Sequence, residues 1–495
     1  MNLPKDIWVH IASYVSPLQL EDLYSVNSAF FNIAMDQRYQ QISFTYLTRK
    51  MVRTLERLKD PAVTKRVRII YIHPHFVKEV INKEQQISNC SNSSLLSRLG
   101  DLAYHVRDQR LFGKPRSRSP LFKFKTFDSL MHVMVDILGG LPNLEDVHIS
   151  WSGLPFVGES PIPIISAALV PHLRRLWLDV SLEKLEPMLP HFARLADVEE
   201  LDLFIRIEHL LDSNRYNVIL IKFAQCINYL LRRTLRKLSI QLFEPLDMSP
   251  FFSSLGRLPL LESLSLSIPV SSPHLGDPDG LIDFLNLHTL SLRSLSIRAT
   301  ELSGRGFTPI DTDLCEWMNT TFPSIRLLRL SSLEISLNLI PLETALVCVR
   351  KFASSLTSLT LTGRHLSFHE VQMVTDAFPE YRHGLESLRI GSVTLTPQVL
   401  DVLAERLPLL SRLELLVREV LPCEGDFPLY YRYGDRSQDE SQVTRFFEEM
   451  ETRFYPDWRV RHLVLSLSSF PFKLQHDTMY KDLFRHCAPS IQTFA

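Results

Sequence analysis

Apolar residues recur along most of this chain in a short phrase of the form apolar-x-x-apolar-x-apolar. Clear copies begin at Leu173, Val198 and Leu235, and weaker ones begin at Val67 and Leu144. Further copies begin at Leu261, Leu292, Ile325, Leu356, Leu385, Leu410, Val460 and Ile491. Alternation of apolar and polar positions is typical of a strand that buries one face. We therefore predict one strand in each repeat.

Helical patterns lie between several of these phrases. Apolar residues recur at helical spacing over residues 216–231, 341–352, 367–378 and 397–407. Two of these stretches open with a capping residue, Ser367 and Thr396. A strand followed by a helix in each repeat predicts a solenoid with parallel strands on the concave face and helices on the convex face.

These repeats resemble leucine-rich repeats in their phrase and in their length. The family usually has an asparagine three positions after the last leucine of the phrase, and here that slot holds Ser181, Arg206 and Phe243, among others. The resemblance therefore implies an α/β fold with an irregular leucine-rich-repeat solenoid, whose repeat number and curvature stay open.

The first forty residues follow a different pattern, that of three short helices. Pro4 suits the first helical position of one helix and Pro17 that of a second, while Asn27 and Ser28 are both candidate N-caps of a third. A unit of this size buries too little surface to be stable unaided. We expect it to dock either on a partner or on the domain that follows.

This segment resembles the F-box motif, whose usual form opens with Leu-Pro-x-Glu/Asp-Ile/Leu. The resemblance covers residues 3–40. This segment is similar in particular to the short, near-terminal F-box of many fungal proteins. It is carried by Leu3-Pro4-Lys5-Asp6-Ile7, Ile11, Tyr14-Val15, Pro17, Leu20, Leu23, Val26, Phe30 and Ile33. One departure is Phe30, where many members have Trp.

In that family the motif packs on the Skp-type adaptor of a cullin-RING ubiquitin ligase. The resemblance implies six adaptor contacts, namely Leu3, Pro4, Ile7, Ile11, Val15 and Leu20. Apolar side chains of this kind would form the centre of a protein interface. The alternative for each is packing within the module's own core.

These patterns predict the following division of the chain. An F-box three-helix module covers residues 1–46, a connecting segment with the first repeat-like strand covers 47–81, a polar and basic insertion covers 82–120, and the solenoid covers 121–495, with a loop insertion near 422–442. The basic part, residues 107–125, is a solvated loop, a nuclear-import signal, a nucleic-acid contact or a segment switched by phosphorylation of Ser117 or Ser119.

Composition and charge narrow the class of protein. Hydrophobic residues make up 45% of the chain and charged residues 22%, which favours an ordered globular protein. A net charge of -1 gives no global attraction to nucleic acid or to an anionic membrane. Because we find neither a signal peptide nor a membrane span, and the six cysteines lack Cys-x-x-Cys spacing, we expect a cytoplasmic or nuclear protein with free thiols.

We find no motif of an enzyme. The chain has no nucleophile elbow, phosphate-binding loop or dinucleotide fingerprint. His369-Glu370 begins like a zinc-protease helix, but position 373 is Met, and His365 lies beyond the cap at Ser367. We therefore expect no catalysis, no metal and no cofactor.

The residues between the two inner apolar positions of each phrase should line the concave face. Trp and Arg dominate many interfaces, so Trp177, Arg329 and Arg389 are the predicted target anchors, with Arg298 and Arg412 near them. An arginine cluster would suit a phosphorylated or acidic target. The alternative is an ordinary polar surface.

Together these patterns predict a non-catalytic substrate adaptor of an SCF-type ubiquitin ligase. Its partners would be the Skp-type adaptor, through it a cullin-RING ligase, and an unknown target protein. The alternative is a leucine-rich-repeat scaffold outside ubiquitination, in which the F-box-like helices serve only as an N-terminal cap.

Overall fold

The computed structural model describes residues 4–73, 75–80, 127–152, 162–195, 197–208, 213–242, 244, 246–269, 277–300, 312–378, 384–424, 440–467 and 477–494. The predicted insertion at 82–120 and most of that at 422–442 lie outside these residues, as does the basic segment 107–125. The chain divides into two compact units, residues 1–235 and 236–495.

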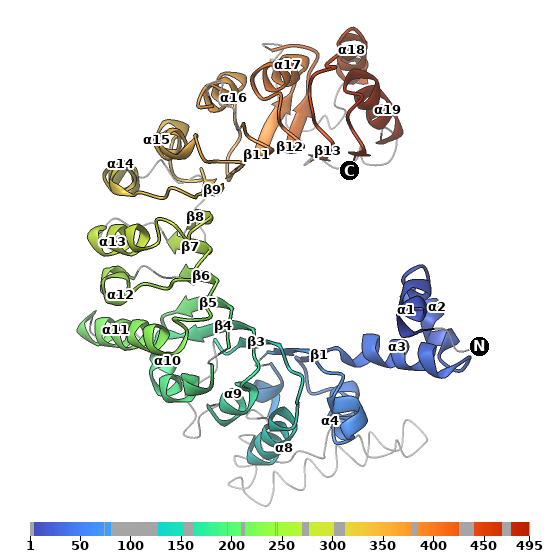
Figure 1. Ribbon diagram of the computed structural model, residues 1–495, viewed down its shortest axis with the longest axis vertical. Coiled ribbons are helices and arrows are strands. Elements are labelled where there is room, and N and C mark those ends of the chain that lie inside the picture. Colours follow the sequence, from blue (N-terminus) through green and yellow to red (C-terminus); the bar gives the residue numbers. More distant parts are fainter. Residues whose placement is uncertain are drawn as a thin grey trace, which may run out of the picture. The chain divides into compact units, whose positions relative to one another are not determined.

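The first unit begins with three helices, as the sequence predicts (Figure 1). They are α1 (Lys5–Ser13), α2 (Pro17–Leu23) and α3 (Ser28–Tyr39). Ser16 forms a capping box with Gln19 before α2, and Pro17 takes the first helical position. Asn27, rather than Ser28, caps α3 by accepting a 2.8 Å hydrogen bond from the backbone N–H of Phe30. Both α1 and α2 contact α3.

The rest of this unit repeats strand and helix. Its parallel strands lie side by side in chain order: β1 (Gln41–Phe44), β2 (Ile69–Ile72), β3 (Asp146–Ser150), β4 (Arg175–Ser181) and β5 (Glu200–Arg206). The helices between them are α4 (Arg49–Arg57), α5 (Pro61–Thr64), α8 (Phe127–Gly139), α9 (Ile162–Ala168), α10 (Leu182–Met188) and the 3-10 helix η2 (Leu189–Arg194), and α11 (Ser213–Leu230) follows β5. One buried row crosses the sheet in register and consists of Ile42, Ile70, Val147, Leu176 and Leu201.

Strand β1 was not predicted from the sequence, although its signal is present. Tyr39, Ile42 and Phe44 follow the same spacing as the later phrases, with Tyr in the first apolar slot. All three side chains are buried. The first repeat strand therefore follows α3 almost directly, inside the segment that the sequence assigned to the three-helix module.

The second unit continues the same pattern. Its parallel strands are β6 (Lys237–Leu242), β7 (Ser263–Pro269), β8 (Ser294–Thr300), β9 (Ser332–Ser336), β10 (Ser358–Thr362), β11 (Ser387–Leu395), β12 (Arg412–Val420), β13 (His462–Leu467) and β14 (Thr493–Phe494). Its helices are α12 (Ser249–Ser254), α13 (Asp279–Leu287), α14 (Thr312–Ser324), α15 (Leu342–Phe352), α16 (Phe368–Thr375), α17 (Pro397–Arg406), α18 (Glu440–Glu451) and α19 (Asp477–Cys487).

The core of this unit is built from the predicted apolar positions. A fully buried leucine row runs in register through Leu238, Leu264, Leu295, Leu333, Leu359, Leu388, Leu413 and Leu463. Capping is also as predicted, since the Ser367 side chain accepts from the Glu370 N–H and the Thr396 side chain from the Val399 N–H. Stacked strand–helix repeats of this kind confirm the α/β leucine-rich-repeat solenoid.

One predicted phrase is wrong. The copy placed at Ile325 begins instead at Leu330, so that Leu333 and Ile335 are the inward positions of β9. Helix α14 extends to Ser324, which leaves no residues for a turn before a strand at Ile325. Leu328, an inward position in the predicted phrase, is 69% exposed.

In both units the helices cover one face of the strands (Figure 1). The opposite strand face, called the open face below, carries the side chains that alternate with the buried rows. No described helix has the length and apolar character that crossing a membrane requires.

Candidate functional site

Helix α1 has two apolar stripes. The inner stripe, Trp8 and Ala12 of α1 together with Val15 just beyond its C-cap, packs on Leu20 of α2 and Phe30 of α3. The Trp8 and Phe30 rings meet edge to face with centroids 5.1 Å apart. This small cluster is the core of the three-helix module.

The second stripe of α1 faces solvent. It consists of Pro4, Ile7, Ile11 and Tyr14, which share one side of the helix because they are three or four positions apart. Ile7 is 46% exposed, Ile11 37% and Tyr14 79%. This set is called the outer stripe below. Four further large apolar side chains of the module are exposed, namely Val9, Tyr24, Val26 and Phe31.

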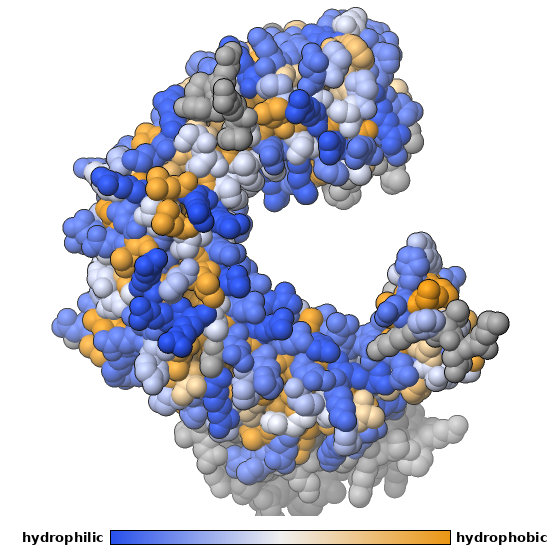
Figure 2. All heavy atoms as spheres, viewed as in Figure 1, coloured by the Kyte–Doolittle hydropathy of each residue, from blue (hydrophilic) through white to orange (hydrophobic). Residues whose placement is uncertain are grey.

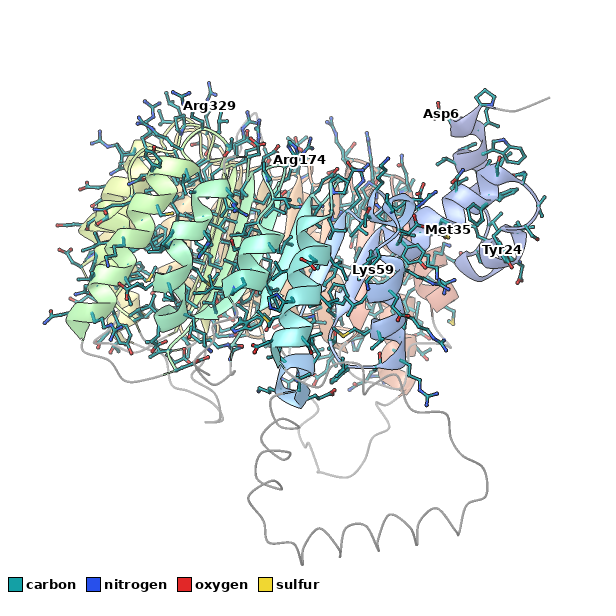
Figure 3. The ribbon with its side chains drawn as sticks, turned by 90° about the horizontal axis from the view of Figure 1, so that it is seen from below. Asp6, Tyr24, Met35, Lys59, Arg174 and Arg329 are labelled. Atoms are coloured by element: carbon teal, nitrogen blue, oxygen red, sulfur yellow. The ribbon has the colours of Figure 1, made fainter. Side chains whose placement is uncertain are left out.

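Figures 2 and 3 show exposed apolar side chains on this module. Apolar side chains appear on the outside of the three-helix module in Figure 2, and Tyr24 lies at its periphery in Figure 3. Isolated exposed apolar residues are common, but contiguous ones mark interaction sites. The outer stripe is therefore the best candidate docking surface of this module.

The predicted adaptor contacts separate into three groups. Pro4, Ile7 and Ile11 are exposed, and Leu3 lies outside the described residues. Val15 is partly buried against the module core. Leu20 is fully buried in that core, so its side chain holds the helices together, as in the alternative of core packing rather than adaptor contact.

Helix α3 is fixed to the first repeats by arginines. Arg66, which precedes β2, donates to the Asn32 carbonyl at 3.1 Å and to the Asn32 side chain at 2.7 Å, and it forms an ion pair with Asp36. Arg57 of α4 donates to the buried Tyr39 hydroxyl at 2.5 Å. The three-helix module is thus joined to the solenoid through α3.

An aromatic row lies on the open face of the first unit. Tyr71, His148 and Trp177 occupy equivalent positions on β2, β3 and β4, with ring centroids 4.3 and 5.9 Å apart, and Phe204 of β5 lies 4.6 Å from Trp177. All four are partly exposed. Partial burial lowers the pKa of His148, opposed by the nearby Asp146 carboxylate, which favours the neutral imidazole.

Two ion pairs flank this row. Arg175 contacts Asp146 at 2.6 Å, and Arg206 contacts Asp179 at 3.1 Å. Among the predicted target-binding residues, Trp177 therefore stands inside a continuous aromatic surface. The sequence singled out Trp177 alone, because the stacking depends on the register between repeats.

The open face of the second unit is polar and its arginines are paired. Arg298 contacts Glu334 at 2.7 Å, and Arg389 contacts Glu414 at 3.4 Å. Arg412 forms an ion pair with the same Glu414. The carboxylates already compensate these three predicted arginines, which weakens the argument for a phosphorylated or acidic target here.

Arg329 does not belong to this surface. It lies in the turn before β9, where Figure 3 shows it outside the strands, and Glu334 occupies the open-face position that was predicted for it. The correction has the same cause as the shifted phrase. The sequence did not identify Glu334 as an open-face residue because that position follows only from the observed register of β9, with Leu333 and Ile335 inward.

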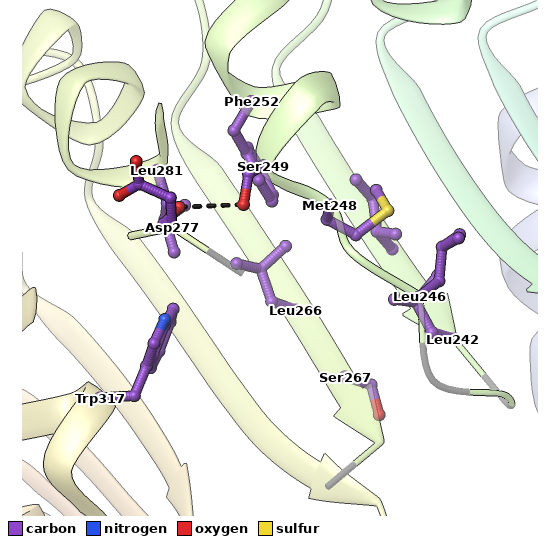
Figure 4. Close-up of a pocket in the computed structure, with 11 residues that line it drawn as sticks. Leu242, Leu246, Met248, Ser249, Phe252, Leu266, Ser267, Asp277, Leu281 and Trp317 are labelled. Carbon is purple, nitrogen blue, oxygen red and sulfur yellow. Dashed lines mark hydrogen bonds between the residues drawn. The ribbon is translucent and has the colours of Figure 1, made fainter. Parts of the chain in front are cut away.

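A small pocket lies between the strand ends and the helices of the second unit (Figure 4). Its free volume is about 30 Å³, and Leu266, Phe252 and Trp317 are among its walls. The Ser249 hydroxyl donates to the Asp277 carbonyl at 3.0 Å beside it. That volume holds a water molecule or two and is too small for an organic ligand.

The histidines and cysteines considered as metal ligands or reactive groups do not form a common site in the described residues. His369 is exposed on α16, whereas His365 lies before the helix within 3.3 Å of the Ser392 and Thr394 hydroxyls. Within the described ranges, no three His, Cys, Asp or Glu side chains gather as a metal site would require. The described cysteines, Cys226, Cys315, Cys348, Cys423 and Cys487, are free thiols.

Comparisons with known protein families and with curated proteins found no match. Among solved structures, the chain is similar to the leucine-rich repeat-containing protein LegL7 from Legionella pneumophila. The identity is 16% over 57% of this chain and 87% of that chain, with a TM-score of 0.37. Similarity at this level says nothing about what this chain binds.

Proposed function

We propose that this protein is a substrate adaptor of an SCF-type cullin-RING ubiquitin ligase. The three-helix module docks on a Skp-type adaptor through the outer stripe, and the solenoid binds a target protein in the cytoplasm or nucleus. The chain makes and breaks no bond itself, and it accelerates ubiquitin transfer by bringing the target close to other subunits.

The exposure of the outer stripe carries this proposal. A helix that only capped the solenoid would bury its apolar positions against the repeats. Here Ile7, Ile11 and Tyr14 remain exposed after the inner stripe has packed on α2 and α3. An exposed apolar stripe on a module that resembles an F-box is what docking on an adaptor requires.

The test is a pull-down of the full chain with a purified Skp-type adaptor. An Ile7→Asp/Ile11→Asp variant should lose binding, because two carboxylates would replace apolar contacts at the centre of the interface. Val9→Asp is the matched control, since Val9 is 48% exposed on the other side of the same helix. Circular dichroism would establish that both variants are folded.

Binding by the intact chain and by Val9→Asp, together with its loss in the double variant, supports the proposal. Equal binding by all three forms would place the contact elsewhere.

One observation favours the alternative scaffold function. Helix α3 supports the first strand through the buried Tyr39 and is held by Arg66, as a capping element would be. If the intact chain binds no Skp-type adaptor, the protein is a scaffold outside ubiquitination. In both functions the open face is the surface that binds the target, with Trp177 in the aromatic row as its strongest anchor.

A further inference from the structure

A groove of about 950 Å³ lies at the start of the solenoid, lined by residues of α3, β1 and α4 and of the loop between β1 and α4. Five of its lining residues are cationic: Arg38, Arg49, Lys50, Arg53 and Arg57. Its described lining contains no Asp or Glu. The groove is distinct from the outer stripe, which lies on α1.

Among the residues that the structure describes, the cations of the groove have no acidic partner. Within the described chain, Arg49, Lys50 and Arg53 take part in no ion pair. Arg57 donates to the Tyr39 hydroxyl, and the guanidinium of Arg38 lies 6.0 Å from the Tyr39 ring centroid. A concentration of unpaired positive charge in a concave surface attracts an anionic ligand.

The arrangement of the cations follows from the α4 sequence. Met51, Val52 and Leu55 bury one side of the helix against the repeat. Arg49, Arg53 and Arg57 succeed one another four residues apart on the other side, with a rise of about 6 Å per step. Alternate side chains of an extended peptide repeat at about 6.6 Å, so every second residue of such a peptide would meet one arginine.

The groove also contains a strand edge. Strand β1 pairs with β2 on one side and, in the described part of the chain, with no strand on the other. The carbonyls of Gln40 and Phe44 accept hydrogen bonds from residues before and after β2. Because backbone groups alternate in direction along a strand, those of Gln41 and Ser43 point to the free edge.

We propose that this groove binds an acidic polypeptide segment of a partner protein, extended along the free edge of β1 with its carboxylates on the α4 arginines. The chain's own neighbouring sequence is no match, because residues 81–126 carry nine Lys or Arg and three Asp or Glu. Free backbone N–H and C=O groups favour a polypeptide over a nucleic acid, whose phosphates accept but cannot donate hydrogen bonds. Tyr46, the one exposed aromatic ring of the groove lining, is stacked on His75 at 5.2 Å.

The first experiment measures fluorescence anisotropy of a labelled peptide of alternating Glu and Thr with the full chain. The variant Arg49→Ala/Arg53→Ala should bind about three- to tenfold more weakly, the effect of two exposed ion pairs. Arg232→Ala/Arg233→Ala is the matched control, because these two exposed arginines lie in the same unit outside the groove. It should bind as the natural chain does.

The second experiment separates strand pairing from charge alone. Two forms of the peptide carry N-methyl groups on alternate amides, one form on each edge. If the peptide adds to β1 as a strand, only the amide N–H groups on the edge facing β1 are needed. The form methylated on that edge should therefore bind at least tenfold more weakly than the form methylated on the outer edge. Equal binding by both forms would overturn the extended pairing.

A single-stranded oligonucleotide of the same charge tests the other polyanion. Tighter binding of the oligonucleotide, lost in the groove variant, would replace the polypeptide by a nucleic acid and overturn the proposal. Absence of peptide binding, or peptide binding that the groove variant retains in full, would overturn it as well. These outcomes do not depend on the outer stripe, so they leave adaptor docking to its own test.

Discussion

Replacing Leu20 by alanine should unfold the three-helix module while the repeats stay folded. Leu20 is fully buried on α2 and belongs to a core whose buried members are Ala12, Leu20 and Phe30. Removing a buried leucine side chain costs about 2–5 kcal/mol, from lost burial and from the cavity that remains. At about 0.05–0.15 kcal/mol per residue, a module of about 40 residues has only about 2–6 kcal/mol in total.

Amide hydrogen exchange measured by mass spectrometry checks this prediction. A loss of about 3 kcal/mol corresponds to an increase of about 150-fold in the exchange rate of the most protected amides of α1 and α2. Peptides from β3 to β5 should exchange as in the natural chain, because α3 has separate contacts with the first repeats through Arg66.

Ile7→Ala serves as the control, because its half-exposed side chain contributes little to folding and should change stability by less than about 0.5 kcal/mol. Unchanged exchange of α1 and α2 in Leu20→Ala would refute the assignment of Leu20 to the core. It would return this residue to the docking surface.

Two further predictions concern the second unit. Nε2 of the buried His288 accepts a hydrogen bond from the Leu258 N–H at 2.9 Å. Burial lowers the pKa of His288 in the folded chain. Unfolding therefore takes up a proton as the pH falls below about 6.5, the ordinary pKa of histidine. Denaturant titrations at about pH 7.5 and about pH 5.5 should show lower stability at the acidic pH, and His288→Phe should reduce this dependence and cost about 1–3 kcal/mol. Gly363 has a φ of 104°, and an added Cβ would lie 2.1 Å from the Asn338 side chain. Gly363→Ala should therefore lower the melting temperature, whereas Gly139→Ala in the first unit, where an added Cβ would meet no atom within 4 Å, should not.

The strands were predictable from the sequence because each apolar phrase buries its own side chains in a stack of like phrases. Leu238, Leu264 and Leu295, for example, lie in one buried row in register. The phrase at Ile325 was misplaced because two overlapping phrases share Leu330. The choice between them depends on where α14 ends, and Pro323 lies inside its last turn rather than after it.

The candidate sites were less predictable than the fold. On α1 the sequence shows apolar residues around much of the helix, and only packing on α2 and α3 separates the inner stripe from the outer one. The pairing of Arg298 with Glu334 joins residues 36 positions apart in sequence. Such a contact depends on how neighbouring repeats align, and no local pattern encodes that.

The two open faces differ in how a target would gain binding energy from them. On the second unit, a phosphate or carboxylate would have to compete with Glu334 and Glu414, which already form ion pairs with Arg298, Arg389 and Arg412. The free-energy cost of desolvating the charged groups offsets most of the attraction that a new ion pair contributes. On the first unit, Trp177 and its aromatic neighbours are partly exposed, and covering them releases water from apolar surface without breaking an ion pair. A target side chain would therefore gain most at the aromatic row, and the paired arginines would chiefly select against targets that cannot satisfy them.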